Sequence, residues 1–291
     1  MVLHPQARAA VEGAAAVPPV WTPGYDIADV RQRDREAALA LPREDVAEVT
    51  DVDADGVRCR LYRPEGALDG TIVHLHGGGF VFNDIDVHDA AARLLANRAG
   101  LSVLSVDYRR PPEHRFPAAL DDVDAALGWL ARSAAGPTYL HGDSAGANLA
   151  LVAALRHPGR FAAIALTYPF LDPTASFASY TTAADGFGPE EAAWYWQQYA
   201  ASPADLTDPD LAPLLSDRLG TLPPTLVVTA EHDPLRDEGE HLAQRLAEEG
   251  VRVVGTRYLG QVHGFWRHAD VFDAAEPLTL QIASFLRSHR G

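Results

Sequence analysis

The sequence predicts an α/β protein whose mostly parallel central sheet is flanked by helices and covered by a small helical cap. Short β-rich runs alternate with helical patterns from residue 57 onward, which requires crossover connections between parallel strands. Apolar residues make up 47% of the 291 residues, so a large core can form without disulfides. Two stretches without strand signals differ from this alternating pattern, and the one that lies between two strands predicts a lid.

Seven runs rich in β-branched and apolar residues are predicted as strands. They are Val57–Tyr62, Thr71–Leu75, Ser102–Asp107, Thr138–His141, Ala163–Thr167, Thr225–Thr229 and Val251–Tyr258. Helical patterns lie between most of them, and one more follows the last strand. These are Val87–Ala99, Pro117–Ala131, Ala145–Arg156, Leu235–Glu249 and Pro277–Ser288. Because strands and helices follow one another in turn, helices should cover both faces of the sheet.

The two stretches without strand signals divide the chain into four segments. Residues 1–45 are alanine-rich, lack a strand signal and contain a charged helical stretch from Asp29 to Leu41. Residues 172–220 hold many prolines and one predicted helix, Pro189–Ala200, and an insertion of this size between two strands favours a lid over the strand ends. We therefore expect 172–220 to form a lid over the α/β core that consists of 46–171 and 221–291.

Charge and cysteine content exclude several function classes. The 24 basic residues are all Arg and face 40 acidic residues, and the resulting net charge of −16 argues against nucleic-acid and anionic-lipid partners. The single cysteine, Cys59, lies in an alternating stretch and is predicted to pack in a strand. No signal peptide is predicted, and the longest nearly apolar run, Phe161–Leu171, is too short to cross a bilayer. We expect a cytoplasmic protein without a membrane partner.

The first chemical motif is Gly142-Asp143-Ser144-Ala145-Gly146, which has the pattern G-x-S-x-G. A predicted strand precedes it and a predicted helix follows it, which is the context that a nucleophile elbow requires. The tight turn leaves no room for side chains two positions before and after the serine. Ser144 is therefore the predicted nucleophile, and the Ala145 N–H lies at the start of the helix, where it can stabilise an oxyanion.

A second motif, His76-Gly77-Gly78-Gly79-Phe80, directly follows the strand Thr71–Leu75. Backbone without side chains can turn its N–H groups toward a substrate oxygen, and lipases and esterases use this sequence for that purpose. A flexible glycine turn and a phosphate-binding loop are the alternatives, but the Lys-Ser/Thr pair of a P-loop is missing.

A serine nucleophile needs a histidine base and a carboxylate that orients the histidine. When the serine lies on a strand–turn–helix elbow, the acid follows it in the chain and the histidine follows the acid. His263 lies just after the last predicted strand, at the sheet edge where Ser144 is expected, and His268 is its nearest competitor. Asp233 lies at the exit of the strand Thr225–Thr229 and is preferred as the acid over Asp237 and Glu238, which lie one turn into the next helix. Asp233 as a simple helix cap is the alternative.

Together these motifs resemble the hormone-sensitive-lipase-like (bacterial family IV) esterases of the α/β-hydrolase fold. The resemblance spans positions 76 to 265. It includes the two glycine motifs, Asp107-Tyr108-Arg109, Phe116-Pro117-Ala118-Ala119, the stretch from Asp233 to Gly239 and His263-Gly264-Phe265. It implies nucleophile Ser144, base His263 and acid Asp233, with oxyanion donors from the backbone of Gly78, Gly79 and Ala145.

The resemblance also implies a cap built from residues 1–45 and 172–220 over the catalytic core, 46–171 and 221–291. It implies an activity and a partner state as well. It implies a serine carboxylesterase that hydrolyses short- to medium-chain acyl esters through an acyl-enzyme, and a possible homodimer formed through a sheet edge. An amidase, such as an N-acetyl or formamide hydrolase, is the alternative because it would use the same triad. A ligand-binding receptor on an inactive scaffold would be expected to lose a triad residue, and all three are present. The family usually has Gly where this chain has Ala147, and the methyl group either narrows the acyl side or alters packing.

Aromatic residues near the motifs are candidates for an apolar substrate pocket, and packing of the cap on the core is the alternative role. The candidates are Phe80, Phe82, Trp194, Trp196 and Phe265. No metal site or other cofactor is predicted: His74 and His76 share a strand face without a third ligand, and Asp51, Asp53 and Asp55 are expected to form a solvated acidic turn.

Overall fold

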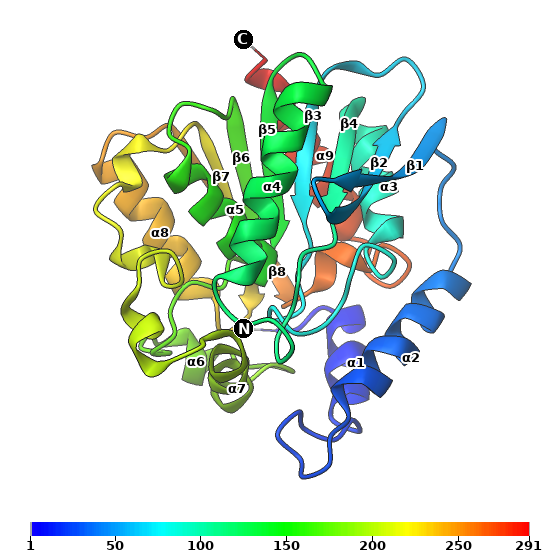
Figure 1. Cartoon of the computed structure of the whole chain (residues 1–291). Helices are drawn as coiled ribbons and strands as arrows, with labels where there is room; N and C mark the ends of the chain where they lie inside the picture. Colours follow the sequence, from blue (N-terminus) through cyan, green and yellow to red (C-terminus); the bar gives the residue numbers. More distant parts are fainter. Residues whose placement is uncertain (1, 291) are drawn as a thin grey trace.

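The computed structural model describes residues 2–290 and has an eight-stranded sheet at its centre (Figure 1). The strands are β1 (Glu48–Ala54), β2 (Val57–Arg63), β3 (Leu68–Leu75), β4 (Leu101–Val106), β5 (Thr138–Asp143), β6 (Ala163–Thr167), β7 (Thr225–His232) and β8 (Val253–Val262). Their order in the sheet is β1-β2-β4-β3-β5-β6-β7-β8. The pairs β1–β2 and β2–β4 are antiparallel, and the other neighbouring pairs are parallel. The predicted mostly parallel sheet is thus confirmed.

Helices cover both faces of the sheet. They are α1 (Pro5–Ala14), α2 (Ile27–Ala40), α3 (Asp89–Ala99), α4 (Ala118–Ser133), α5 (Ala145–Arg156), α6 (Ser179–Thr182), α7 (Pro189–Tyr199), α8 (Arg236–Glu248) and α9 (Ala275–Ser288), with short 3-10 turns η1 (Pro203–Thr207), η2 (Pro213–Leu215), η3 (Leu219–Thr221) and η4 (Phe265–Arg267). Buried residues of α4, α5 and α8 form one hydrophobic core with one face of the sheet. Buried residues of α3 and α9 form a second core with the other face.

This two-sided burial explains why the central strands are apolar throughout. All five residues of β6 are buried, as are the last six of β3. A strand covered on both faces gains from apolar side chains at every position, so its sequence is a short apolar run without alternation. Several strands were predicted from such apolar runs, and the seven predicted strands correspond to β2–β8.

The first strand, β1, was missed because its acidic residues were interpreted as a turn. Asp51 and Asp53 lie within β1, and only Asp55 lies in the tight turn before β2, with φ +58°. Asp51 accepts hydrogen bonds from Arg58 and Arg60 on the paired strand. Cross-strand ion pairs therefore replace the apolar alternation that identifies a half-buried strand.

Helices α1, α2, α6 and α7 gather at the end of the sheet where the parallel strands finish, below the sheet in the view of Figure 1. The charged stretch and the cap helix of the sequence correspond to α2 and α7, whereas α1 and α6 were not predicted. Helix α1 is tied to the core by the His4 N–H, which donates to the Gly260 carbonyl at 2.9 Å. Within residues 2–290, no helix is both long and apolar enough to cross a membrane.

Candidate active site

Ser144 lies at a sharp corner between β5 and α5. Its backbone has φ 55° and ψ −121°, a conformation that L-residues rarely adopt, and its N–H donates to the Thr167 carbonyl of β6 at 2.9 Å. A Cβ atom at Gly142 would collide with the Gly146 carbonyl, and one at Gly146 would collide with the Leu75 carbonyl. The two glycines let strand, turn and helix approach closely enough to hold this corner.

Hydrogen bonds join three side chains from three different strand ends. His263 Nε2 lies 2.9 Å from Ser144 Oγ, and His263 Nδ1 lies 2.8 Å from Asp233 Oδ2. Ser144 follows β5, Asp233 follows β7 and His263 follows β8. Because parallel strands end at one edge of the sheet, residues 119 positions apart in the chain meet there.

The surroundings fix the orientation of the His263 imidazole. Asp233 is completely buried, and its Oδ1 accepts the Leu235 N–H at 2.9 Å while its Oδ2 faces the ring. The rings of Tyr168 and Phe187 lie 4.7 and 5.0 Å from the imidazole, measured between centroids. Asp233 therefore caps the local turn and faces His263 at the same time, so the two roles considered for it coexist.

The competing candidates His268, Asp237 and Glu238 make no hydrogen bond to Ser144 or His263. His268 makes no side-chain hydrogen bond within residues 2–290, and burial, with Arg267 nearby, lowers its pKa to about 3. Asp237 accepts the Ser179 N–H, and Glu238 accepts the Leu171 N–H and the Tyr180 hydroxyl.

The glycine loop after β3 runs beside Ser144. Gly78 and Gly79 have positive φ values of 120° and 59°, and both line the cavity that contains Ser144. In the described part of the chain, the N–H groups of Gly78, Gly79 and Ala145 donate no hydrogen bond. The loop is anchored by the Gly77 N–H, which donates to Asp143 Oδ1 at 2.9 Å.

A cavity of about 290 Å³ opens above Ser144 and His263. Its wall comes from the glycine loop, from α1, from the segment around Phe187 and α7, and from the residues that follow β8. The lining residues are Ala10, Val11, Ala14, Gly78, Gly79, Asn83, Asp143, Ser144, Phe170, Asp185, Gly186, Phe187, Glu191, Tyr195, Val262, His263, Gly264, Arg267, His268 and Phe272. Segments that are distant in sequence thus enclose one site.

The predicted pocket aromatics do not line this cavity and instead pack in the interior. Phe80 is fully buried and stacks on Tyr199, with ring centroids 3.8 Å apart. Phe82 packs against Trp194, Trp196 packs against Phe170, and Phe265 lies in the core on the opposite face of the sheet from α5. These five residues therefore have the alternative role considered above, which is packing between side chains. Ala147 is likewise buried in the core, away from the cavity.

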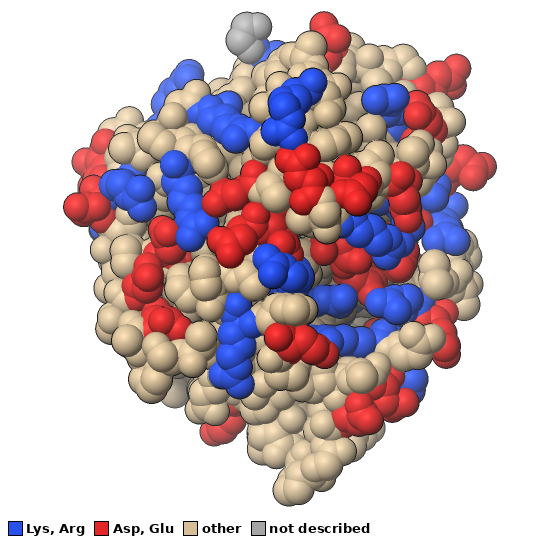
Figure 2. All heavy atoms as spheres, viewed as in Figure 1, with Lys and Arg blue, Asp and Glu red and all other residues tan. Residues whose placement is uncertain are grey.

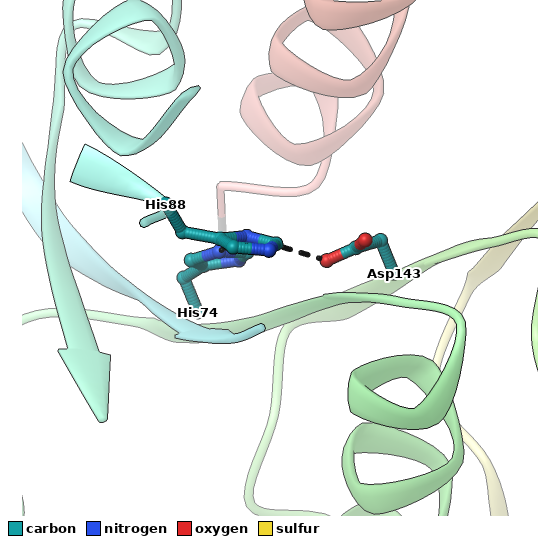
Figure 3. A group of neighbouring side chains, drawn as sticks. All are labelled: His74, His88 and Asp143. Atoms are coloured by element: carbon teal, nitrogen blue, oxygen red, sulfur yellow. Dashed lines mark hydrogen bonds and ion pairs between the residues drawn. The ribbon is translucent and has the colours of Figure 1, made fainter. Parts of the chain in front are cut away.

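Three buried side chains beneath Ser144 form a group that could hold a metal ion. One ligand atom each from His74, His88 and Asp143 lies within 4.8 Å of the others, and Figure 3 shows the two imidazoles facing the carboxylate. His88 Nδ1 lies 3.4 Å from His74 Nε2 and 3.6 Å from Asp143 Oδ1. Burial lowers the pKa of both histidines well below 6.5, so both imidazoles are neutral. From the sequence, His74 and His76 were expected to share a strand face. In the structure, the His76 ring stacks on Tyr108 and is not part of this group.

Two neighbours favour a hydrogen-bonded network over a bound cation at this group. The Asn83 amide nitrogen lies 3.5 Å from His88 Nε2 and also donates to the Gly77 carbonyl, so it faces His88 as a donor and favours the ring proton on Nδ1, toward Asp143. Burial raises the pKa of Asp143 to about 6, and the positive charge of Arg267 acts on the same carboxyl. A cation would therefore meet both a competing proton and a like charge.

Comparison with known proteins identifies the family. A family model described as the alpha/beta hydrolase fold matches residues 72–267. The chain belongs to the α/β-hydrolase family. The α/β-hydrolase fold and the resemblance to its hormone-sensitive-lipase-like branch, both expected from the motifs, are thereby confirmed.

Relatives of this α/β-hydrolase match along most of its length. The carboxylic ester hydrolase LipN of Mycobacterium tuberculosis is 36% identical over 289 residues, which cover 91% of this chain and 77% of that protein. The ethyl acetate hydrolase of Pseudomonas putida is 33% identical over 282 residues, 89% of each chain. The hyperthermophilic esterase of Pyrobaculum calidifontis has a TM-score of 0.89 and 35% identity, with 99% of each chain covered.

Several cavity residues of this α/β-hydrolase escaped the sequence reasoning. The wall from α1 could have been found, because Ala7, Ala10, Val11 and Ala14 have the i, i+3, i+4, i+7 spacing of an apolar helix face. Arg267 gave no such signal, since a single Arg after the histidine motif has no distinctive pattern.

Proposed function

We propose that this α/β-hydrolase is a serine carboxylesterase that hydrolyses short- to medium-chain acyl esters through an acyl-enzyme on Ser144. The observation that carries this proposal is the chain of contacts from Asp233 through His263 to Ser144, at 2.8 and 2.9 Å. The ester-hydrolase names of its relatives support the same reaction.

The proposed reaction begins with proton transfer. His263 Nε2 takes the Ser144 hydroxyl proton while Oγ attacks the ester carbonyl, and Asp233 holds the ring proton on Nδ1 and stabilises the imidazolium. The tetrahedral intermediate then collapses, the C–O bond to the alcohol breaks, and His263 gives the proton to the departing alkoxide. Water repeats the sequence on the acyl-enzyme: His263 removes its proton, the hydroxyl attacks the acyl carbon, and Ser144 recovers its proton as the acid departs.

In this proposal, the oxyanion is held by backbone donors. The N–H groups of Gly78, Gly79 and Ala145 are free of other acceptors in the described residues, and Ala145 is the first residue of α5, where the helix dipole favours negative charge. One such donor is worth about 10²–10³ in rate where it has been removed from a hydrolase.

The size and walls of the cavity support short or medium acyl groups. Its volume of about 290 Å³ is at the lower end of the range for small-molecule sites. Walls from α1 and from the segment that includes Phe187 and Tyr195 support the assignment of residues 1–45 and 172–220 to a cap over the core segments 46–171 and 221–291. The homodimer implied by the resemblance would use the free edge of the sheet at β8, where Val254 and Leu259 are exposed.

A chain-length series of p-nitrophenyl esters, beside anilides with the same acyl groups, tests the proposal. We expect turnover to peak at short or medium acyl chains, ester turnover to exceed anilide turnover, and Ser144→Ala to abolish both. Ser105→Ala is the matched control, because Ser105 is also buried but lies in β4 away from the cavity. Activity that survives in Ser144→Ala would overturn the mechanism, and faster anilide turnover would overturn the esterase assignment.

A further inference from the structure

Arg267 is a charged residue of the cavity that the proposed chemistry does not use. It ends the short turn η4, which starts directly after Gly264 and so follows His263 closely in the chain. Arg267 is partly buried and lines the cavity that contains Ser144, and it also lines a second cavity between α2 and α3. Among the residues that line the cavity of Ser144, it is the only Arg.

The guanidinium of Arg267 has no partner within residues 2–290. Of the 24 Arg residues, four have side chains that make neither a hydrogen bond nor an ion pair there: Arg8, Arg252, Arg267 and Arg290. The other three of these are exposed, so water can satisfy them. A guanidinium has five N–H donors, so Arg267 can donate to an acceptor on a molecule bound in the cavity without giving up a partner in the described chain.

The acidic residues of the cavity already have other partners. Asp185 Oδ2 lies 2.7 Å from His232 Nδ1, and Glu191 accepts the Tyr195 hydroxyl at 2.9 Å. Burial raises the pKa of Glu191, which favours its neutral form. Neither carboxyl forms an ion pair with Arg267, so neither competes for it in this arrangement.

The field of Arg267 extends in two directions from its position. Toward the cavity, its charge acts to lower the pKa of Asp143, the neighbour of Ser144, against the larger effect of burial. Away from the cavity, it acts on Asp34 of α2, with which it makes no ion pair. The positive charge is therefore close to the reacting centre and forms no ion pair with residues 2–290.

We propose that Arg267 forms an anion-binding subsite of the catalytic cavity, and that the substrates of this enzyme are esters bearing a carboxylate. A guanidinium binds a carboxylate through two parallel charge-assisted hydrogen bonds, which fix the orientation as well as adding affinity. This inference rests on the proposed esterase function and names the substrate class for the same site.

Matched neutral and anionic esters test the proposal on both sides of the scissile bond. On the acyl side, mono-p-nitrophenyl succinate is compared with p-nitrophenyl butyrate, which has an acyl chain of equal length. On the alcohol side, 4-carboxyphenyl acetate is compared with phenyl acetate. We expect the parent enzyme to have a lower KM for the anionic ester in one of these pairs, and this pair identifies the side on which the carboxylate binds.

The variant Arg267→Gln separates anion binding from general damage. We expect it to raise the KM of the preferred anionic ester about tenfold to 100-fold, with kcat/KM for the neutral partner within about threefold of the parent. Arg267→Lys should recover part of the loss, and added salt should raise the anionic KM of the parent more than that of Arg267→Gln. Arg252→Gln, which removes an exposed and unpaired Arg outside the cavity, should change neither KM.

Three outcomes of these experiments decide whether Arg267 forms an anion-binding subsite. Equal effects of Arg267→Gln on anionic and neutral esters would overturn the subsite. A parent enzyme that neither hydrolyses either anionic ester nor is inhibited competitively by succinate or by 4-hydroxybenzoate would also overturn it. Failure of the esterase proposal is distinguishable, because the neutral esters would then not be hydrolysed by the parent or would still be hydrolysed by Ser144→Ala.

Discussion

Asp233 illustrates how one side chain can serve the local structure and the site together. One carboxylate oxygen accepts the Leu235 N–H at the turn before α8, and the other lies 2.8 Å from His263 Nδ1. The turn fixes the carboxylate without help from His263, so the acceptor is already oriented when the imidazole becomes charged. Such preorganisation is the means by which hydrolases avoid reorganisation costs during the reaction.

The tautomer of His263 is the property that an Asp233→Asn variant should change. The Asn carbonyl would keep the Leu235 N–H, and its amide N–H₂ would then face His263 Nδ1 as a donor. The ring proton would move to Nε2, where it blocks proton transfer from Ser144. We expect kcat to fall by roughly 10³–10⁴-fold, with little change in KM and in the circular dichroism spectrum.

Asp237→Asn provides the comparison for this prediction. Asp237 lies in the same acidic stretch, but it contacts Ser179 and Arg236 instead of His263. We expect this variant to retain most of its activity. A large loss of kcat in Asp237→Asn together with a small loss in Asp233→Asn would refute the assignment of the acid.

At the scale of elements, the β5–α5 connection depends on the absence of side chains at two positions. Gly146 is in the first turn of α5 and lies against the carbonyl groups that end β3. We expect Gly146→Ala to lower the free energy of unfolding by about 1–3 kcal/mol, because the backbone must shift, and to reduce activity as Ser144 moves. Urea denaturation and p-nitrophenyl ester turnover measure the two effects.

Gly128→Ala in α4 is the matched variant for Gly146→Ala. Gly128 also lies within a helix, but an added Cβ would meet only the end of the Arg132 side chain at 3.6 Å. Alanine should therefore stabilise the protein by about 0.5–1 kcal/mol through its helix propensity. Equal effects of the two substitutions would show that close packing does not constrain the elbow.

The elements that the sequence predicted are those with strong local patterns. Strands β2–β8 correspond to short runs rich in β-branched and apolar residues, with apolar residues at alternate positions in β2, and α5 was predicted with both of its ends as observed. β1 escaped because Asp51 is stabilised by Arg58 and Arg60, which are partners that become visible only after the strands have paired. An ion pair between strands leaves no periodic signal in the sequence.

In the candidate site, too, the residues with a local sequence pattern were predicted and the others were not. Ser144, Asp233 and His263 each belong to a short motif of consecutive residues at the end of a predicted strand. Their order in the chain was therefore enough to predict them as the triad. The cavity wall depends on how α1 and α7 fold over the sheet. Of the predicted aromatics, Phe80, Trp196 and Phe265 pack in the core, and Phe82 and Trp194 pack against each other outside the cavity. Side-chain direction in the cap is set by tertiary packing, which a single sequence does not specify.

At the scale of the whole molecule, the net charge of −16 is spread over a surface on which both signs are mixed. Figure 2 shows Arg and acidic side chains adjacent to one another across the visible face. Arg58 and Arg60, for example, both pair with Asp51 and Asp86. Local pairing of this kind places both signs side by side on this face, and among residues 2–290 Arg267 differs because it is partly buried and makes no ion pair.

The stability of the whole molecule should depend on pH through Glu238. This carboxyl is completely buried where α8 meets the residues after β6, and burial, the largest cause, raises its pKa well above 4.5. When the pKa is higher in the folded than in the unfolded chain, the folded state retains a proton that the unfolded state has lost. The stability contributed by the neutral group is then fully present below the unfolded pKa and is lost as the pH rises toward the folded pKa.

Glu238→Gln removes this titration and keeps the hydrogen bonds. The Gln carbonyl can accept the Leu171 N–H, and its amide can donate to the Tyr180 hydroxyl. We expect the free energy of unfolding of the variant to exceed that of the parent by a margin that grows between pH 5 and pH 8 in urea titrations. Glu248→Gln, at the exposed end of the same helix, should show no such growth. A margin that shrinks as the pH rises would instead mean that the folded protein holds Glu238 as a carboxylate, because stabilisation of the charged form has the opposite sign.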